Sequence, residues 1–291
     1  MEPERRELRH QAFGSGRDQC ILSLAEEDLS AVYPGMVRFV LRVTGHGRTL
    51  ALFRTNSYEY TAAEALTAEA AALRQADAWQ EELRKDPSAF SGNDVQESPA
   101  NLPAGEHDLV ILQGSPRPDG NCATLASWAV RAAADAKKTA RIIYPHDLDI
   151  HCCIGCYQCY NTGSCVFDDD MTGIIAAIRG ASLVIVCSPV YTNTVPAGVK
   201  LVIDRMQAYH AERVLYGKRT GQSGLLFAVA GRSGEENFTC ITKVIRPFLN
   251  NIGIVPAGQI LVDRADAIRD IRTVVGLEDR VRELVRTSFR K

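Results

Sequence analysis

Apolar residues gather in short continuous runs over the second half of the chain, and amphipathic stretches separate these runs. The amphipathic stretches have helical spacing. The apolar runs lie at 108–113, 140–144, 181–188, 224–230 and 254–262. Strands that are apolar along their whole length are typical of a parallel sheet covered by helices on both faces. The pattern therefore predicts a doubly wound α/β domain with a five-stranded parallel sheet.

The first half of the chain has a different pattern. Two β-rich runs, MVRFVLRV at 36–43 and RTLALFRT at 48–55, flank the turn segment TGHG. Such runs around a short glycine-containing turn predict an antiparallel hairpin. A long helix rich in Ala, Leu and Glu is predicted over 61–85, because Thr61 and Glu64 have the spacing of a capping box. The hairpin and the helix together make a small α+β module.

Composition marks a boundary between these halves. Residues 87–106 are rich in proline, glycine and small polar residues and show no sustained periodicity, which is typical of a linker. The predicted organisation is a small α+β module at 1–86, a linker at 87–106 and the α/β domain at 107–291.

Charge and hydropathy exclude several classes of partner. The formal net charge is −2, which gives no electrostatic reason to expect nucleic acid or an anionic membrane. No apolar run is long enough to span a bilayer, and the first ten residues are charged where a signal peptide would be apolar. We therefore expect a cytoplasmic protein. In a reducing compartment its nine cysteines are more often thiols, metal ligands or redox groups than disulfides.

The loop GSPRPDGNCAT at 114–124 follows the first apolar run and opens a helix. Its backbone N–H groups and the positive end of the helix dipole can surround an anion, to which Ser115, Asn121 and Thr124 add neutral donors and Arg117 a charge. The loop lacks the glycine patterns of dinucleotide and nucleoside triphosphate sites. A phosphate site and a plain turn before a helix are both open at this point.

A second unusual loop, SPVYTNTVPAGVKLVIDR at 188–205, follows the third run. Two prolines stiffen it, and Tyr191, Thr192 and Asn193 offer an aromatic ring, a hydroxyl and an amide at the edge of the sheet. A planar heteroaromatic ligand would fit against it. Taken alone, the loop is more simply a connector whose tyrosine covers the core.

Together the two loops resemble those of the flavodoxin-like NAD(P)H-dependent FMN reductases. GSPR followed by GN and a helix resembles the FMN phosphate loop of that family, and the pattern S-P-x-Y with a later P-x-x-x-K and an IDR ending resembles its isoalloxazine loop. The loop AGRSGEENF at 230–238 would close the site by the same resemblance. The family usually has Thr or Ser after GN, whereas this chain has Cys122, which is a weaker hydrogen-bond donor. Thr124 is therefore expected to matter more for phosphate binding here.

This resemblance implies a flavodoxin-like domain that binds FMN, with hydride entering from NAD(P)H. No catalytic acid or base is expected, because the flavin supplies the chemistry. Arg232 would stabilise negative charge on the reduced ring. The implied cofactor-binding residues are Ser115, Arg117, Asn121, Cys122, Ala123, Thr124, Pro189, Val190, Tyr191, Thr192, Asn193, Ala230, Gly231 and Arg232.

The loop after the second run, CCIGCYQCYNTGSC at 152–165, contains five of the cysteines. Cys153, Cys156, Cys159 and Cys165 have the spacing C-x2-C-x2-C-x5-C, and its first half is that of a ferredoxin [4Fe–4S] run. The wider final gap contains Thr162 and Gly163, which favour a turn that would let Cys165 complete one local site. Zinc is the rival metal, although this spacing crowds one side of a tetrahedron. Cys152 is most simply a spectator.

The cysteine loop resembles that of the iron–sulfur flavoproteins, in which a C-x2-C-x2-C motif and a nearby fourth cysteine precede DDM and a helix, as Asp169, Asp170 and Met171 follow here. The resemblance implies a [4Fe–4S] cluster beside FMN. FMN reductases with much of this loop and no cluster leave a cluster-free form open. The acids at the start of the helix are explained better by capping and the helix dipole than by a metal.

The predicted function is transfer of electrons between NAD(P)H or a ferredoxin-type donor and a small-molecule or protein acceptor. One alternative is a cluster-free NAD(P)H-dependent FMN or quinone reductase. A second is a flavin-binding protein of redox sensing or assembly. The resemblance also implies a homodimer or homotetramer.

Overall fold

The computed structural model describes residues 3–16, 19–61, 63–97, 104–217 and 221–289. It divides into two compact units. Unit 1 comprises Met1–Asn101, Ile154–Val166 and Val214–Tyr216, and unit 2 comprises Leu102–Cys153, Phe167–Arg213 and Gly217–Lys291. Within the predicted linker, residues 98–103 lie outside the described residues. The Val95 N–H donates to the Thr49 carbonyl at 2.8 Å, so the beginning of that segment contacts the N-terminal strands.

Unit 2 contains the predicted five-stranded sheet, in the order β6-β5-β7-β8-β9 with every neighbouring pair parallel. Each strand matches one of the apolar runs, which confirms the doubly wound fold. The strands are β5 (Leu109–Gln113), β6 (Ala140–Ile143), β7 (Leu183–Pro189), β8 (Ser223–Val229) and β9 (Val255–Val262).

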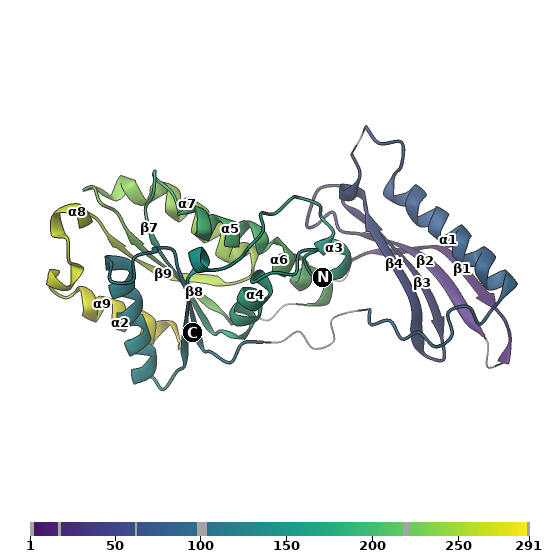
Figure 1. The fold of residues 1–291 in the computed structure, drawn as a ribbon, viewed down its shortest axis with the longest axis horizontal. Helices are drawn as coiled ribbons and strands as arrows, with labels where there is room; N and C mark the ends of the chain where they lie inside the picture. Colours follow the sequence, from purple (N-terminus) through teal and green to yellow (C-terminus); the bar gives the residue numbers. More distant parts are fainter. Residues whose placement is uncertain (1–2, 17–18, 62, 98–103, 218–220, 290–291) are drawn as a thin grey trace. The chain divides into compact units, whose positions relative to one another are not determined.

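Helices cover both faces of this sheet (Figure 1). Alternate residues of each strand enter different cores, as Leu109 and Ile111 pack with one set of helices and Val110 and Leu112 with the other. Strands buried on both sides need apolar residues at every position, which explains their continuous apolar runs. The first set is α2 (Asn121–Asp135) and α9 (Leu277–Ser288), and the second is α4 (Met171–Gly180), α5 (Ala197–Arg205), α6 (Gln207–Tyr216) and α7 (Thr239–Asn251). Among the described helices, none combines the length and apolar character needed to span a bilayer.

Unit 1 contains an antiparallel sheet in the order β1-β2-β3-β4, with one face packed on α1 (Ala68–Lys85). The predicted hairpin is confirmed as β3 and β4, joined by His46 and Gly47, which both have positive φ. A two-residue turn of this handedness matches the twist of the strands it joins. The strands are β1 (Arg5–Phe13), β2 (Cys20–Asp28), β3 (Val37–Gly45) and β4 (Arg48–Asn56).

Two strands of unit 1 are not among the predicted elements, and its helix begins later than predicted. β1 and β2 mix charged and apolar residues, and β1 is exposed along most of its length, so neither forms an apolar run. The pair Thr61 and Glu64 does form, since the Thr61 N–H donates to the Glu64 carboxylate at 2.6 Å, but it closes an isolated turn. The helix begins at Ala68, where the Thr67 hydroxyl accepts the N–H of Ala70 at 3.1 Å.

A buried arginine of unit 2 ties together the two ends of the cysteine loop. Arg205 donates to the carbonyl of His151 at 2.7 Å and to both carboxylate oxygens of Asp169 at 2.6 and 3.0 Å. The side chains of Arg205 and Asp169 are 1% and 2% exposed, and the guanidinium lies 5.1 Å from the centre of the Phe167 ring. The Asp169 carboxylate also accepts the Met171 N–H at 3.1 Å and so satisfies a donor at the start of α4, whereas the side chain of the N-cap residue, Asp170, makes no cap bond. The loop is therefore closed at its base.

This ion pair generates a stability prediction. Asp169→Asn removes one charge and leaves the other buried, so we expect it to lower the free energy of unfolding of unit 2 by about 3 to 5 kcal/mol. Urea unfolding at neutral pH measures the loss. The control is Asp204→Asn, which breaks the exposed pair with Lys200 on the same helix and should change stability by less than about 1 kcal/mol. Equal losses of stability in the two variants would contradict the role of the buried Arg205–Asp169 pair in stabilising unit 2.

The same pair predicts a dependence on pH. Burial alone would raise the pKa of Asp169, but hydrogen bonds from Arg205 and from the N–H groups of His151 and Met171 lower it to about 2. A depressed carboxyl pKa contributes stability that is complete above the unfolded value near 3.8 and is lost as the pH falls toward 2. The stability difference between the wild type and Asp169→Asn should therefore shrink over that range, as urea unfolding at a series of pH values will show.

Candidate functional site

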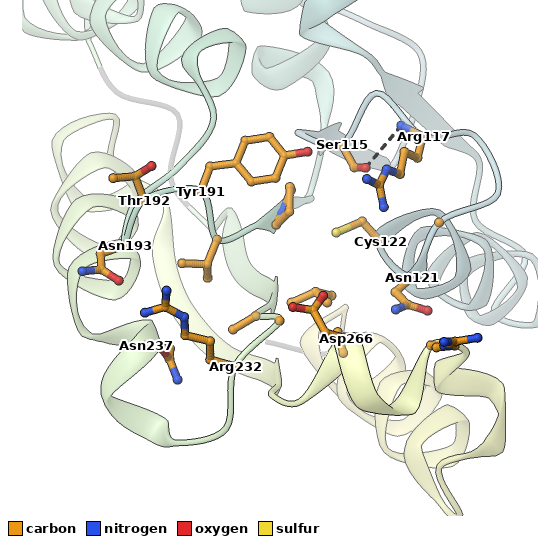
Figure 2. A pocket seen from close by; sticks show the side chains of 18 residues that line it. Ser115, Arg117, Asn121, Cys122, Tyr191, Thr192, Asn193, Arg232, Asn237 and Asp266 are labelled. Atoms are coloured by element: carbon orange, nitrogen blue, oxygen red, sulfur yellow. Dashed lines mark hydrogen bonds between the residues drawn. The ribbon is translucent and has the colours of Figure 1, made fainter.

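A cavity of about 810 Å³ opens at the carboxyl edge of the parallel sheet in unit 2 (Figure 2). Its volume is typical of sites for cofactors and other small molecules. The loops after β5, β7, β8 and β9 supply most of its wall. The lining residues are Ser115, Arg117, Gly120, Asn121, Cys122, Pro189, Val190, Tyr191, Thr192, Asn193, Val229, Ala230, Gly231, Arg232, Asn237, Ala265, Asp266 and Arg269.

The structure brings together around this cavity all the predicted FMN-binding residues except Ala123 and Thr124. The Thr124 hydroxyl donates to the Gly120 carbonyl at 3.3 Å, so it completes the first turn of α2. The Ala123 N–H points to Gln113, whose side-chain oxygen accepts it at 3.0 Å once the amide is oriented to satisfy both its ends. Both residues thus lie outside the cavity lining, and their role in binding FMN stays a prediction.

The loop after β5 leaves N–H groups open at the cavity. Gly120 precedes α2 and has no side chain to cap it, so the first turn keeps donors for an anion. Ser115 is buried, and its Oγ accepts the Arg117 N–H at 3.3 Å. A Cβ on Gly114 would lie 2.6 Å from Val199, which explains the glycine at this close approach. This end of the cavity suits a phosphate.

The loop after β7 is a strained two-residue turn. The N–H of Tyr191 donates to the carbonyl of Thr194 at 2.9 Å, and the N–H of Thr194 donates back at 3.0 Å. Thr192 and Asn193 between them have φ of 47° and 63°. A β-branched residue rarely adopts this conformation, and such strain is found where the surroundings impose a functional geometry. Tyr191 is 45% exposed and borders the cavity, where its ring offers a flat apolar surface.

The loop after β9 contributes a wall that the sequence analysis missed. Its short helix α8 (Ala265–Ile268) lies between Arg264 and Arg269, which have φ of 55° and 60°. The Asp266 carboxylate packs so closely on Gly231 that a Cβ there would lie 2.4 Å from its oxygen. The position of this loop after the fifth parallel strand was the available signal, since ligands bind at the carboxyl ends of all such strands.

Positive charge dominates the cavity. Arg117, Arg232 and Arg269 line it, against one carboxylate from Asp266 among the described lining residues. Figure 2 shows two groups of side chains on opposite sides of the cavity, with Asp266 between them: Ser115, Arg117, Asn121 and Cys122 on one side, and Tyr191, Thr192, Asn193 and Arg232 on the other. The Asn121 side chain also accepts the N–H of Ile271 at 3.2 Å and so fastens the chain beyond α8 to this wall. The arrangement suits an anionic ligand with a planar body.

The four predicted metal ligands are distributed between the units. Cys153 belongs to unit 2, and Cys156, Cys159 and Cys165 belong to unit 1. All nine cysteines of the chain carry thiols and not disulfides, and the described residues contain no group of three or more His, Cys, Asp or Glu side chains arranged to hold a metal. The four thiols have the donor chemistry of an iron–sulfur site, and the three that belong to unit 1 are not gathered around a common point in this structure.

The part of the chain that forms this cavity is similar to known proteins. Residues 108–266 match the family model described as NADPH-dependent FMN reductase, which covers more than half of the chain. The chain belongs to the NADPH-dependent FMN reductase family. FMN is therefore its cofactor, and the open first turn of α2 and the positive cavity are an environment that the phosphate of FMN fits.

Within this FMN reductase family the chain is close to proteins named iron–sulfur flavoprotein. It is 32% identical over 147 residues to one from Methanocaldococcus jannaschii, a match that spans 50% of this chain and 74% of the relative. It is 32% identical over 149 residues to another from Archaeoglobus fulgidus, across 51% of this chain and 65% of the relative. A solved NAD(P)H:quinone oxidoreductase from Methanothermobacter marburgensis has a TM-score of 0.49 and 16% identity, over 63% of this chain and 97% of that one.

The end of the cavity that carries Arg117 yields a prediction for FMN affinity. Arg117→Gln removes an exposed cation that lines the cavity, and loss of a charge-assisted contact should weaken FMN binding by about tenfold to a hundredfold. Titration of flavin fluorescence measures the dissociation constant. Arg141→Gln, which removes an equally exposed cation from β6 and from no part of the cavity, is the control. An FMN affinity of Arg117→Gln within about twofold of the control would show that Arg117 does not contact the phosphate.

Proposed function

We propose that this chain is an NAD(P)H-dependent oxidoreductase that binds FMN in the cavity at the carboxyl edge of the parallel sheet and passes its electrons to a redox acceptor. The observation that carries the proposal is the chemistry of that cavity, which has open helix N–H groups and Arg117 at one side and Tyr191 and Arg232 at the other. Two ends of different chemistry suit a ligand with a phosphate and a planar ring.

When bound, FMN would accept hydride from NAD(P)H and return the electrons singly or in pairs. The residues of this chain would position it. The first turn of α2 and Arg117 would hold the phosphate through N–H donors and charge. Tyr191 would cover one edge of the ring plane, and Arg232 would stabilise negative charge on the reduced ring. Asp266, which is close to Gly231, would disfavour a second anion at that wall.

A second candidate function is relay of electrons by an iron–sulfur flavoprotein, with a ferredoxin-type donor and a [4Fe–4S] cluster on Cys153, Cys156, Cys159 and Cys165. Two observations favour it: the four thiols lie within one short segment, and relatives at 32% identity are named iron–sulfur flavoprotein. Soft thiolates at this spacing are ligands for such clusters. No step of the reaction is derived through the cluster, because the thiols are not gathered around a common point in this structure.

Two further properties belong to the same proposal. We propose that the protein acts in the cytoplasm and as a homodimer or homotetramer, with no nucleic acid or membrane partner. The net charge of −2 supports the absence of a nucleic acid or membrane partner. A purely regulatory or assembly role, in which the flavin is not turned over, is the alternative that the following experiment tests.

The test is anaerobic purification of the full chain, followed by an absorbance spectrum, assays of iron and acid-labile sulfide, and addition of NADH or NADPH. We expect flavin bands that bleach rapidly with at least one nucleotide, and turnover when a quinone or dye is added. Iron and sulfide near four per chain would support the iron–sulfur form.

Each other outcome rejects one candidate. Flavin bands without iron would reject the cluster and leave the reductase. Reduction by ferredoxin with no response to either nucleotide would reject NAD(P)H as donor and support the relay. A flavin that no donor reduces would leave the regulatory role, and absence of bound flavin would overturn the proposal as a whole.

A further inference from the structure

One face of the N-terminal sheet carries charged and amide side chains that are nevertheless buried. Arg38 on β3 pairs directly opposite Glu27 on β2 and Asn56 on β4, so these residues form one row across three strands. Their exposed fractions are 7%, 6% and 0%. The alternate residues of β3, such as Leu41, belong to the core under α1. The row lies on the opposite face from that core and is buried all the same, so a second surface must cover it. Charged residues are almost never buried unless paired, so this surface should offer polar partners.

The cysteine segment 154–166, which belongs to the same unit, supplies the partners of this polar face. Asn56 Nδ2 donates to the Tyr157 carbonyl at 3.2 Å and to Asn161 Oδ1 at 2.9 Å. Arg38 is held by an ion pair with Glu27 and donates to the Tyr160 carbonyl at 3.2 Å.

The same face reaches the end of the segment. Arg54 donates to the Asn161 carbonyl at 3.2 Å, and the Tyr216 hydroxyl donates to the Thr162 carbonyl at 3.0 Å. The Asn161 side chain in turn donates to Glu59. Consecutive carbonyls of the segment, from 160 to 162, thus accept hydrogen bonds from side chains outside it.

These bonds meet a need of the segment itself. Its helix α3 (Cys159–Thr162) has only four residues and ends at Gly163, whose φ is 76°. A helix this short is unstable alone, and its last carbonyls have no partners within the helix. The donors on the sheet and on Tyr216 satisfy those carbonyls. The local sequence of the segment therefore does not by itself determine its conformation.

Backbone strain in the segment leads to the same conclusion. Tyr157 has φ of 56°, an uncommon conformation for an aromatic residue. Its ring contacts those of Tyr33 and Tyr58, with centroids 5.6 and 5.0 Å away, and its carbonyl accepts the bond from Asn56. Strained conformations persist where surrounding contacts impose them. Tyr157 lies between Cys156 and Cys159, so the imposed conformation sets where these two thiols lie.

We propose that the polar face of the N-terminal sheet is a positioning platform for the cysteine segment. Arg38 and Asn56 are positioning residues: they fix the backbone that carries Cys156 and Cys159 and so control the access of reagents to these thiols. Only the extension of this role to iron binding rests on the proposed iron–sulfur function. The platform also gives a function to the four N-terminal strands, whose described residues include no group of three or more His, Cys, Asp or Glu side chains that could hold a metal.

The test is the substitution Asn56→Asp in the full chain. The aspartate keeps the oxygen that accepts the Tyr58 N–H at 3.0 Å, but it replaces the donor to Tyr157 and Asn161 by an acceptor. The Cys159 side chain is buried, so its alkylation depends on opening of the segment. We expect the alkylation rate of Cys159 by iodoacetamide, followed by peptide mass spectrometry, to rise by about tenfold or more, with faster hydrogen exchange at 157–162.

Controls separate this effect from general destabilisation. Asn93→Asp, at an exposed position of the same unit, should behave as the wild type, and Cys187 in unit 2 should stay unreactive in every variant. The affinity for FMN should not change, because the cavity lies in unit 2. An alkylation rate of Cys159 within about twofold of the wild type, with the amides of β2 and β3 still protected, would overturn the proposal.

If Asn56→Asp exposes the amides of β2 and β3, the decision passes to Asn161→Asp. This substitution keeps the oxygen that accepts from Asn56, but it replaces the donor to Glu59 by a second carboxylate and so repels the segment from the end of β4. The hydrogen bonds between the strands are left intact, and the same two outcomes apply. Iron reconstitution provides a spectroscopic measurement. If the wild type binds iron, either variant should lack the absorbance of the iron centre while it keeps its flavin. Wild type that binds no iron would refute the iron–sulfur function, while the alkylation rates still decide on the platform.

Discussion

The parallel direction of the five strands in unit 2 is the constraint on which the candidate site depends. Because all the strands end at the same edge, residues distant in sequence, such as Ser115, Tyr191 and Arg232, meet around one cavity. The order β6-β5-β7 adds a second condition. The chain passes from β5 to β6 on one side and then returns to β7 on the other, so the loops that follow β5 and β7 diverge and leave a crevice. Charge and donors then determine which ligand can occupy it.

Strain is concentrated where this scaffold shapes its loops. Thr192 and Asn193 after β7, and Arg264 and Arg269 after β9, have positive φ although none is a glycine. Each such residue costs of the order of 1 kcal/mol, which the close-packed sheet and its helices offset. The strained conformations occur at the rim of the cavity because relaxed loops would not hold Tyr191 and Asp266 at its wall. Tyr157 shows the same relation in unit 1, where the polar face of the sheet acts as the scaffold.

The sequence predicted those features that depend on short-range pattern. Apolar runs identified all five parallel strands, and the rule that ligands bind after such strands led to the loops at Ser115 and Tyr191. Features that depend on distant partners were missed. Nothing local indicates that Asn121 fastens Ile271, or that Arg205 closes the cysteine loop through Asp169.

The start of the helix in unit 1 shows the limit of local signals. One bond of the capping box forms, from the Thr61 N–H to the Glu64 carboxylate, yet the helix begins seven residues later, at Ala68. A cap describes one turn and does not determine whether the chain continues as a helix. Packing decides that question: Ala68, Ala72 and Ala76 are buried against the sheet, and α1 begins where this contact begins.

The cysteines of this chain fall into two environments, and the difference explains why a platform is needed. Cys20 and Cys187 are buried in the two units, and burial raises the pKa of both thiols, which keeps them protonated and unreactive. Metal binding and redox chemistry require thiols that reagents can reach, and Cys156 and Cys165 are partly exposed. Tyr157 and Tyr160 of this segment pack on Tyr33, but its backbone carbonyls still need polar partners. Hydrogen bonds from Arg38 and Asn56 to its backbone give it a fixed conformation and leave those thiols accessible.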